Sequence, residues 1–67
     1  MGVHTVEEFA PPGAVGHRLA SQRKLAGLTQ QQLAARSHVS ASLISQVERG
    51  VVPASPGFTA AVASGLE

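Results

Sequence analysis

Four polar side chains between residues 42 and 49 have the types and spacing to recognise a polar ligand. They are Ser42, Ser45, Gln46 and Arg49. Their spacing of i, i+3, i+4 and i+7 places them on one face of an α-helix, and no acidic or bulky apolar residue interrupts it. Hydroxyl, amide and guanidinium groups can pair with the base edges exposed in the major groove of B-DNA. A polar face is also typical of an ordinary solvated helix, so the spacing alone leaves two interpretations open.

Gln46 is the member of this group best suited to specify a base. A glutamine amide can form two hydrogen bonds with adenine, which discriminates against a wrong base by about 1 to 3 kcal/mol. Ser42 and Ser45 are short and accept several bases, while Ala41 at the start of the segment could contact a thymine methyl group. Arg49 lies at the far end of the face, where a phosphate contact is favoured over a guanine contact.

Thr29 and Gln30 form a second candidate site at the expected start of another helix. The free N–H groups and partial positive charge of a helix N-terminus suit a phosphate oxygen. For Thr29 the competing role, capping the helix, is favoured over a phosphate contact. For Gln30 a phosphate contact is favoured.

The first of the elements that must position these groups is a helix over residues 14–26. Val15, Leu19 and Ala26 fall close to one helical face, with Leu25 beside them as a compensating apolar residue. This pattern predicts that the helix buries that face.

The next helix has a clear start signal. Gly27 can end the preceding helix in a left-handed conformation. Thr29 and Gln32 then have the spacing of a capping box, and Leu28 and Leu33 have that of a hydrophobic staple. These signals predict a helix of about two turns.

The helix that carries the polar face is expected over residues 41–49. Ser40 is its N-cap, and Val39 and Ile44 form a second staple. Ile44 and Val47 point inward, opposite the polar side chains.

A fourth helix is expected to begin at Ser55, the cap, and Pro56. Apolar residues then recur at helical spacing, at Phe58, Ala61, Val62 and Leu66. Gly65 is expected to leave the end ragged. No alternation typical of strands persists, so the predicted class is all-α, a compact bundle of four short helices.

Composition sets further limits. With 67 residues and no cysteine, the chain has room for one small domain without disulfides or a thiolate metal site. Residues 1–13 are expected to form a flexible tail before a domain at 14–67. The formal net charge is +1, but between residues 14 and 66 five Lys and Arg side chains oppose only Glu48. No membrane span or secretory signal is present, so a cytoplasmic location is the default expectation.

Catalytic and metal-binding patterns are missing from the sequence. His4, His17 and His38 share no ligand spacing, and no cysteine or paired carboxylate joins them. No serine has a recognisable base and orienting acid, and there is no glycine-rich phosphate loop. We therefore expect no metal, no cofactor and no enzymatic activity.

Residues 15–66 resemble the helix-turn-helix domain of the phage-repressor and Cro-like family, also called the xenobiotic-response-element family of bacterial regulators. The resemblance is carried by the segment GLTQQQLAARSHVSASLISQVERG at residues 27–50. Its matching pieces are Gly-Leu-Thr-Gln at 27–30, Leu33-Ala34, Val39-Ser40, Ile44-Ser45 and Glu48-Arg49-Gly50.

This resemblance implies a bundle of five helices, with the third in the major groove and the second across the backbone. It places Ala41, Ser42, Ser45 and Gln46 at base-reading positions. Gln30 falls where relatives clasp phosphate, and Arg49 falls close to the DNA backbone. Arg23 and Glu48 match a structural pair that ties helix one to helix three.

Three positions depart from the family pattern. His38 stands where glycine is usual in the turn, which implies a strained left-handed conformation. Ala41 replaces a residue that is often glutamine, which moves specificity toward Gln46. The fifth helix is missing, so residues 14–67 are expected to be a domain truncated at its C-terminus.

The expected function is sequence-specific binding of a double-stranded DNA operator by the DNA-binding domain of a bacterial transcriptional regulator. The expected full-length protein is a homodimer, with any effector acting on a domain outside this chain. The alternative is a protein-interaction module on the same bundle fold, as in an antitoxin or a scaffold.

Overall fold

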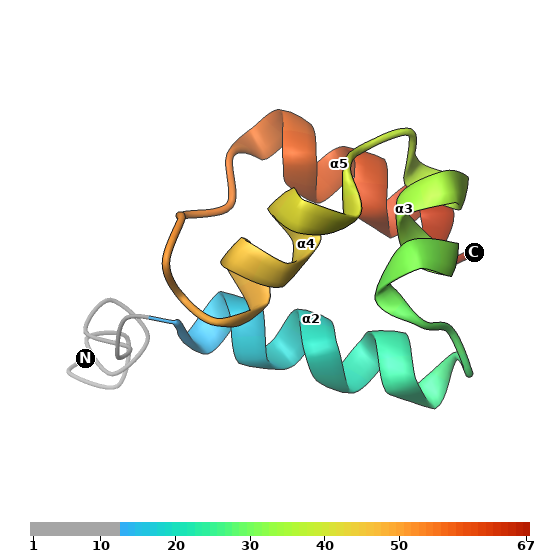
Figure 1. Cartoon of the computed structure of the whole chain (residues 1–67), viewed down its shortest axis with the longest axis horizontal. Coiled ribbons are helices and arrows are strands. Elements are labelled where there is room, and N and C mark those ends of the chain that lie inside the picture. Colours follow the sequence, from blue (N-terminus) through green and yellow to red (C-terminus); the bar gives the residue numbers. More distant parts are fainter. Residues whose placement is uncertain (1–12) are drawn as a thin grey trace, which may run out of the picture.

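Four helices make up the part of the chain that the computed structural model describes, residues 13–67 (Figure 1). They are α2 (Ala14–Leu25), α3 (Gln30–Ser37), α4 (Ala41–Glu48) and α5 (Pro56–Gly65). No strand occurs among these residues. The predicted all-α bundle of four short helices is confirmed, while twelve of the thirteen residues expected as a tail lie outside the described part.

The helices begin where the capping residues predict. Thr29 and Gln32 form the capping box: Thr29 Oγ1 accepts from the Gln32 N–H at 3.0 Å, and Gln32 Oε1 accepts from the Thr29 N–H at 2.8 Å. Ser40 and Ser55 cap α4 and α5 by accepting from the N–H groups three residues on, at 3.0 and 3.1 Å. Each cap satisfies a helix-terminal N–H that has no partner within its own helix.

The turn between α3 and α4 has the predicted left-handed residue. His38 has φ 59° and ψ 35°, and it is the one non-glycine residue with positive φ in residues 13–67. This conformation turns the chain so that α4 starts three residues later, at Ala41, and runs at an angle to α3 (Figure 1).

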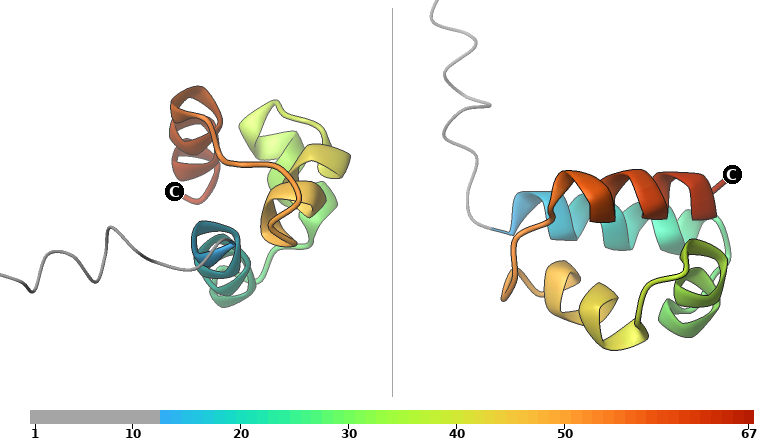
Figure 2. Two further views of the ribbon diagram at one scale, coloured as in Figure 1. Left: turned by 90° about the vertical axis from the view of Figure 1, so that its left-hand side faces the viewer. Right: turned by 90° about the horizontal axis from the view of Figure 1, so that it is seen from above.

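The core lies where α3 meets both α4 and α5. Leu33 of α3 and Ile44 of α4 are fully buried, and the other buried apolar residues surround them: Leu19, Ala34, Val47, Phe58 and Val62. Figure 2 shows α2 and α5 running in the same general direction, with α3 and α4 to one side of them. The inward face predicted for α4 is therefore confirmed.

The buried face of α2 differs from the prediction. Val15 and Leu25 are 56% and 88% exposed, and Ala26 lies at the exposed end of the helix. The helix instead buries Gly16 together with Leu19 and Arg23.

Gly16 explains the shift. A Cβ placed on Gly16 would overlap the Val47 carbonyl, so the absence of a side chain lets α2 lie directly against the α4 backbone. The side of α2 that is buried is determined by close backbone contact and by a buried arginine, whereas the prediction assumed an apolar stripe.

Gly65 also differs from the prediction. It is buried at the end of α5, where a Cβ would overlap Ser37 Oγ, and its carbonyl accepts from Arg36 Nε at 2.6 Å. The end of α5 is packed against α3 and is not ragged.

Candidate nucleic-acid interface

The polar face of α4, consisting of Ser42, Ser45, Gln46 and Arg49, is turned away from the core. Ser42 and Arg49 are exposed, and Ser45 and Gln46 are half-buried. Ile44 and Val47 on the opposite side are buried. Within residues 13–67 none of the four polar side chains has a hydrogen-bond partner, so their donors and acceptors are available to a ligand.

Ala41 and Arg49 mark the two ends of this face. Ala41 is the first residue of α4 and is half-buried, with its side chain packed against the core. Arg49 was expected inside the helix but lies just after it, as the C-cap, with φ −85° and ψ −2°. It still extends the line of α4, because its N–H bonds to the Ser45 carbonyl at 3.0 Å.

The N-terminus of α3 holds the second candidate site. The capping box occupies the N–H groups of Thr29 and Gln32. Among the described residues the N–H groups of Gln30 and Gln31 have no acceptor, so two donors remain at the positive end of the helix dipole. Thr29 Oγ1 acts as the cap, and its hydroxyl hydrogen has no acceptor within residues 13–67.

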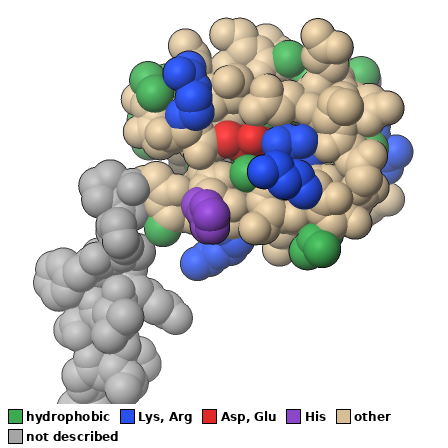
Figure 3. Space-filling view, turned by 60° about the horizontal axis from the view of Figure 1, so that its bottom comes forward, with side chains coloured by type: hydrophobic (Ala, Val, Ile, Leu, Met, Phe, Trp, Pro, Cys, Tyr) green, Lys and Arg blue, Asp and Glu red, His purple; other side chains and the backbone are tan. Residues whose placement is uncertain are grey.

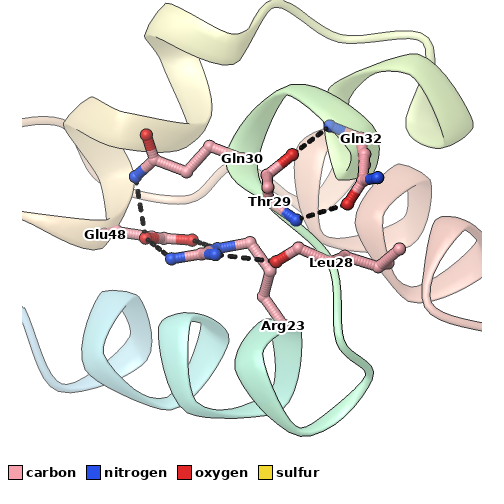
Figure 4. A network of polar contacts seen from close by, with 6 residues as sticks. All are labelled: Arg23, Leu28, Thr29, Gln30, Gln32 and Glu48. Atoms are coloured by element: carbon pink, nitrogen blue, oxygen red, sulfur yellow. Dashed lines mark hydrogen bonds and ion pairs between the residues drawn. The ribbon is translucent and has the colours of Figure 1, made fainter.

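Arg23 and Glu48 form a bidentate ion pair between α2 and α4 (Figure 4). Arg23 Nε and Nη2 donate to Glu48 Oε2 and Oε1 at 2.7 and 3.1 Å. Arg23 Nη1 donates to the Leu28 carbonyl at 2.8 Å. Their side chains are only 11% and 6% exposed, so the pair fixes α2 against α4 and against the turn that leads into α3.

Gln30 joins this pair and adds α3 to the network. Its Nε2 donates to Glu48 Oε1 at 2.9 Å, across 18 positions of sequence. The phosphate-contact candidate and the last residue of α4 are thus held together. Sequence reasoning missed this contact, because nothing in the types or spacing of Gln30 and Glu48 distinguishes it from a side chain that faces solvent.

The network keeps Glu48 ionised. Burial opposes the charge, but the hydrogen bonds from Arg23 and Gln30 together with the positive charges of Arg23 and Lys24 outweigh it, so the pKa of the Glu48 carboxyl lies below its ordinary value. The hydrogen bond to Glu48 raises the pKa of Arg23 in spite of burial. Both groups are charged at neutral pH, and the pair as a whole is neutral.

The face seen in Figure 3 carries several basic side chains. Lys, Arg and His side chains are spread around a small acidic area on this side of the molecule. Because Arg23 neutralises Glu48, the other Lys and Arg side chains leave residues 14–66 with a positive charge, which favours an anionic partner.

No metal or membrane site was found in the described part of the chain. Residues 13–67 contain no group of three His, Asp or Glu side chains that could hold a metal ion. None of the helices found there is long and apolar enough to cross a bilayer.

Comparison with protein families matches residues 14–67 to a model described as a helix-turn-helix domain. Comparisons with curated proteins and with solved structures give no match. The matched range includes all four helices and both candidate contact regions.

Proposed function

The chain belongs to the helix-turn-helix domain family, and from this premise we propose that it binds double-stranded DNA in a sequence-specific way. The observation that carries the proposal is the polar face of α4, which has no hydrogen-bond partner within residues 13–67 and is held by the Arg23–Glu48–Gln30 network beside the N-terminus of α3. In a helix-turn-helix, the second helix enters the major groove and the first crosses the backbone. In this chain α4 enters the major groove, and α3 crosses the DNA backbone.

Base recognition falls to the outward side of α4. Gln46 pairs with adenine through its amide, and Ala41 contacts a thymine methyl group. Ser42 and Ser45 add hydrogen bonds that tolerate several bases. Gln46 therefore supplies most of the direct sequence preference.

Backbone contacts position α4 in the groove. Gln30 and the free N–H groups at the start of α3 hold one phosphate, with Thr29 adding its hydroxyl donor. Arg49, exposed just beyond α4, holds another phosphate. These contacts carry affinity without reading sequence.

We propose that this domain is the DNA-binding domain of a bacterial transcriptional regulator of the phage-repressor and Cro-like type. The full-length protein would act in the cytoplasm as a homodimer on a two-fold operator and control promoter occupancy. An effector would act on another domain of that protein.

Two substitutions test this assignment when duplex binding is measured over a range of salt concentrations. Arg49→Ala should weaken binding to all sequences alike and lower the slope of log K against log salt by about 0.9, the value for one phosphate. Gln46→Ala should mainly relax the preference at one base position.

Matched controls lie on α2, in the groove between α2 and α5 and away from the proposed DNA contacts. Arg18→Ala and Gln22→Ala remove an exposed arginine and an exposed glutamine there. Both should leave duplex affinity close to wild type. If Arg49→Ala and Gln46→Ala bind like these controls, the proposed interface is wrong.

A protein-interaction module is the second candidate, and one observation favours it. A groove of about 410 Å³ between α2 and α5 is lined mostly by apolar side chains, among them Val15, Leu19, Phe58 and Val62. A protein partner seated there would be displaced by Val15→Glu, whereas DNA binding through α4 would survive that change.

A further inference from the structure

Glu48 is placed to do more than hold the helices together. We propose that it is a positioning residue for DNA binding, which holds the Gln30 amide in the one orientation that presents an N–H to a phosphate. This inference rests on the proposed DNA-binding function and deepens it. The supporting contact is the hydrogen bond from Gln30 Nε2 to Glu48 Oε1 at 2.9 Å.

The orientation of the Gln30 amide follows from the chemistry of its partner. An ionised carboxylate only accepts hydrogen bonds, so Gln30 must turn its NH₂ group toward Glu48. Figure 4 shows the nitrogen directed at Glu48 and the oxygen pointing away from it. One Nε2 hydrogen is used in this bond, and the second remains as a donor near the free N–H groups of α3.

Glu48 can anchor Gln30 because its carboxylate is buried and bonded to Arg23 through both oxygens. Its side chain is only 6% exposed, and both carboxylate oxygens accept from Arg23, at 2.7 and 3.1 Å. Arg23 is held in turn by the Leu28 carbonyl at 2.8 Å. The Gln30 amide is therefore anchored to the packed interior of the domain.

Arg23 also makes this arrangement compatible with a phosphate. A lone carboxylate beside Gln30 would repel the DNA backbone, but the bidentate guanidinium cancels its charge. Gln30 thus gains an anchor without an added negative charge. The Gln30 side chain loses rotamer freedom when the domain folds. Its entropy cost on binding DNA is therefore smaller.

A double-mutant cycle in duplex affinity tests the positioning role, with each variant measured well below its melting temperature. Gln30→Ala should weaken binding about tenfold, the loss of a hydrogen bond to a charged group. Glu48→Gln preserves shape, removes the obligatory acceptor and should weaken binding about threefold, a fraction of that loss. In the Gln30→Ala background, Glu48→Gln should cause no further loss.

The matched control is Gln31, the exposed neighbour that makes no hydrogen bond to Glu48 within the described chain. In the Gln31→Ala background, Glu48→Gln should cost its full threefold, because the two changes are independent. A merely structural role for Glu48 would give the same loss in both backgrounds, and that result would overturn the positioning role while leaving DNA binding intact. Failure of the wild-type protein to bind any duplex would overturn both proposals.

A second measurement uses only the wild-type protein, so its result does not depend on whether a Glu48 variant folds. In the DNA-free wild-type protein, side-chain ¹⁵N relaxation should show the Gln30 amide to be more rigid than the Gln31 amide. Equal mobility of the two amides would overturn the positioning role.

Discussion

Glu48 is a buried carboxylate that receives N–H donors from two helices. Arg23 contributes Nε and Nη2, and Gln30 contributes Nε2. Because these bonds exist only in the folded state, they lower the pKa of Glu48 below the value of 4.5 that an ordinary glutamate has. A group whose pKa is lower in the folded state contributes stability above its unfolded pKa and loses it as the pH falls.

The free energy of unfolding should therefore fall as the pH drops from 4.5, the ordinary value, through the lowered folded pKa of Glu48. In Glu48→Gln this part of the pH dependence should disappear, although that variant is less stable near neutral pH. Urea unfolding at a series of pH values measures the effect. Equal acid dependence in both proteins would show that Glu48 is not the group responsible.

His38 ends α3 in a left-handed conformation that glycine adopts more readily. Its φ of 59° brings the side chain close to the backbone, at a cost that is moderate for histidine. His38→Gly should add about 0.5 to 1 kcal/mol of stability and raise the melting temperature by a few degrees, with DNA binding retained.

His17→Gly is the control for this change. His17 lies inside α2 and has no positive φ, so glycine there should destabilise the domain by about 0.5 kcal/mol, the difference between the helix propensities of histidine and glycine. If His38→Gly also lowers the melting temperature, the strain assigned to the turn is absent.

At the scale of elements, α2 and α4 pack through their backbones. Gly16 sits against the Val47 carbonyl and the Cα of Glu48, with no room for a side chain. This contact brings Arg23, two turns later on α2, within reach of the end of α4. The position of the polar face thus depends on a residue without a side chain.

Gly16→Ala should push α2 away from α4 and destabilise the fold by about 1 to 3 kcal/mol, the range for overpacking. Gly57→Ala is the matched control, because it also lies in a helix but has nothing within 4 Å of the added Cβ. It should be neutral or slightly stabilising. Comparable losses in both variants would argue against a special contact at Gly16.

These elements show which features could be predicted from the sequence. The starts of α3, α4 and α5 depend on contacts within three residues, and the caps at Thr29, Ser40 and Ser55 predicted all of them. The left-handed turn at His38 was implied by the resemblance, because glycine is usual at that position in the family. Local hydrogen bonding is readable from spacing because both partners lie in one short segment.

The parts that were not predictable depend on long-range contacts. The prediction of the buried face of α2 was wrong, because hydrophobic periodicity counts apolar side chains and gives no weight to Gly16 or Arg23. The Gln30–Glu48 bond joins residues 18 positions apart, and only the packing of α3 on α4 brings them together. The DNA roles of Ser42, Ser45 and Gln46 remain predictions, supported by the absence of hydrogen-bond partners for them among residues 13–67.

For the whole molecule, the distribution of charge matters more than its sum. The formal net charge is only +1, yet residues 14–66 carry five Lys and Arg side chains and one carboxylate, which is itself paired. The network of Arg23, Glu48 and Gln30 joins α2, α3 and α4. The proposed phosphate contacts of α3 and the groove-reading face of α4 should consequently move as one body.

Selection of bound sites from a pool of random DNA duplexes tests the central claim most directly. The account predicts that the wild-type protein enriches a defined site containing an adenine whose preference is lost in Gln46→Ala. If the pool shows no enrichment, or if both proteins enrich the same site, α4 does not read DNA in the way proposed.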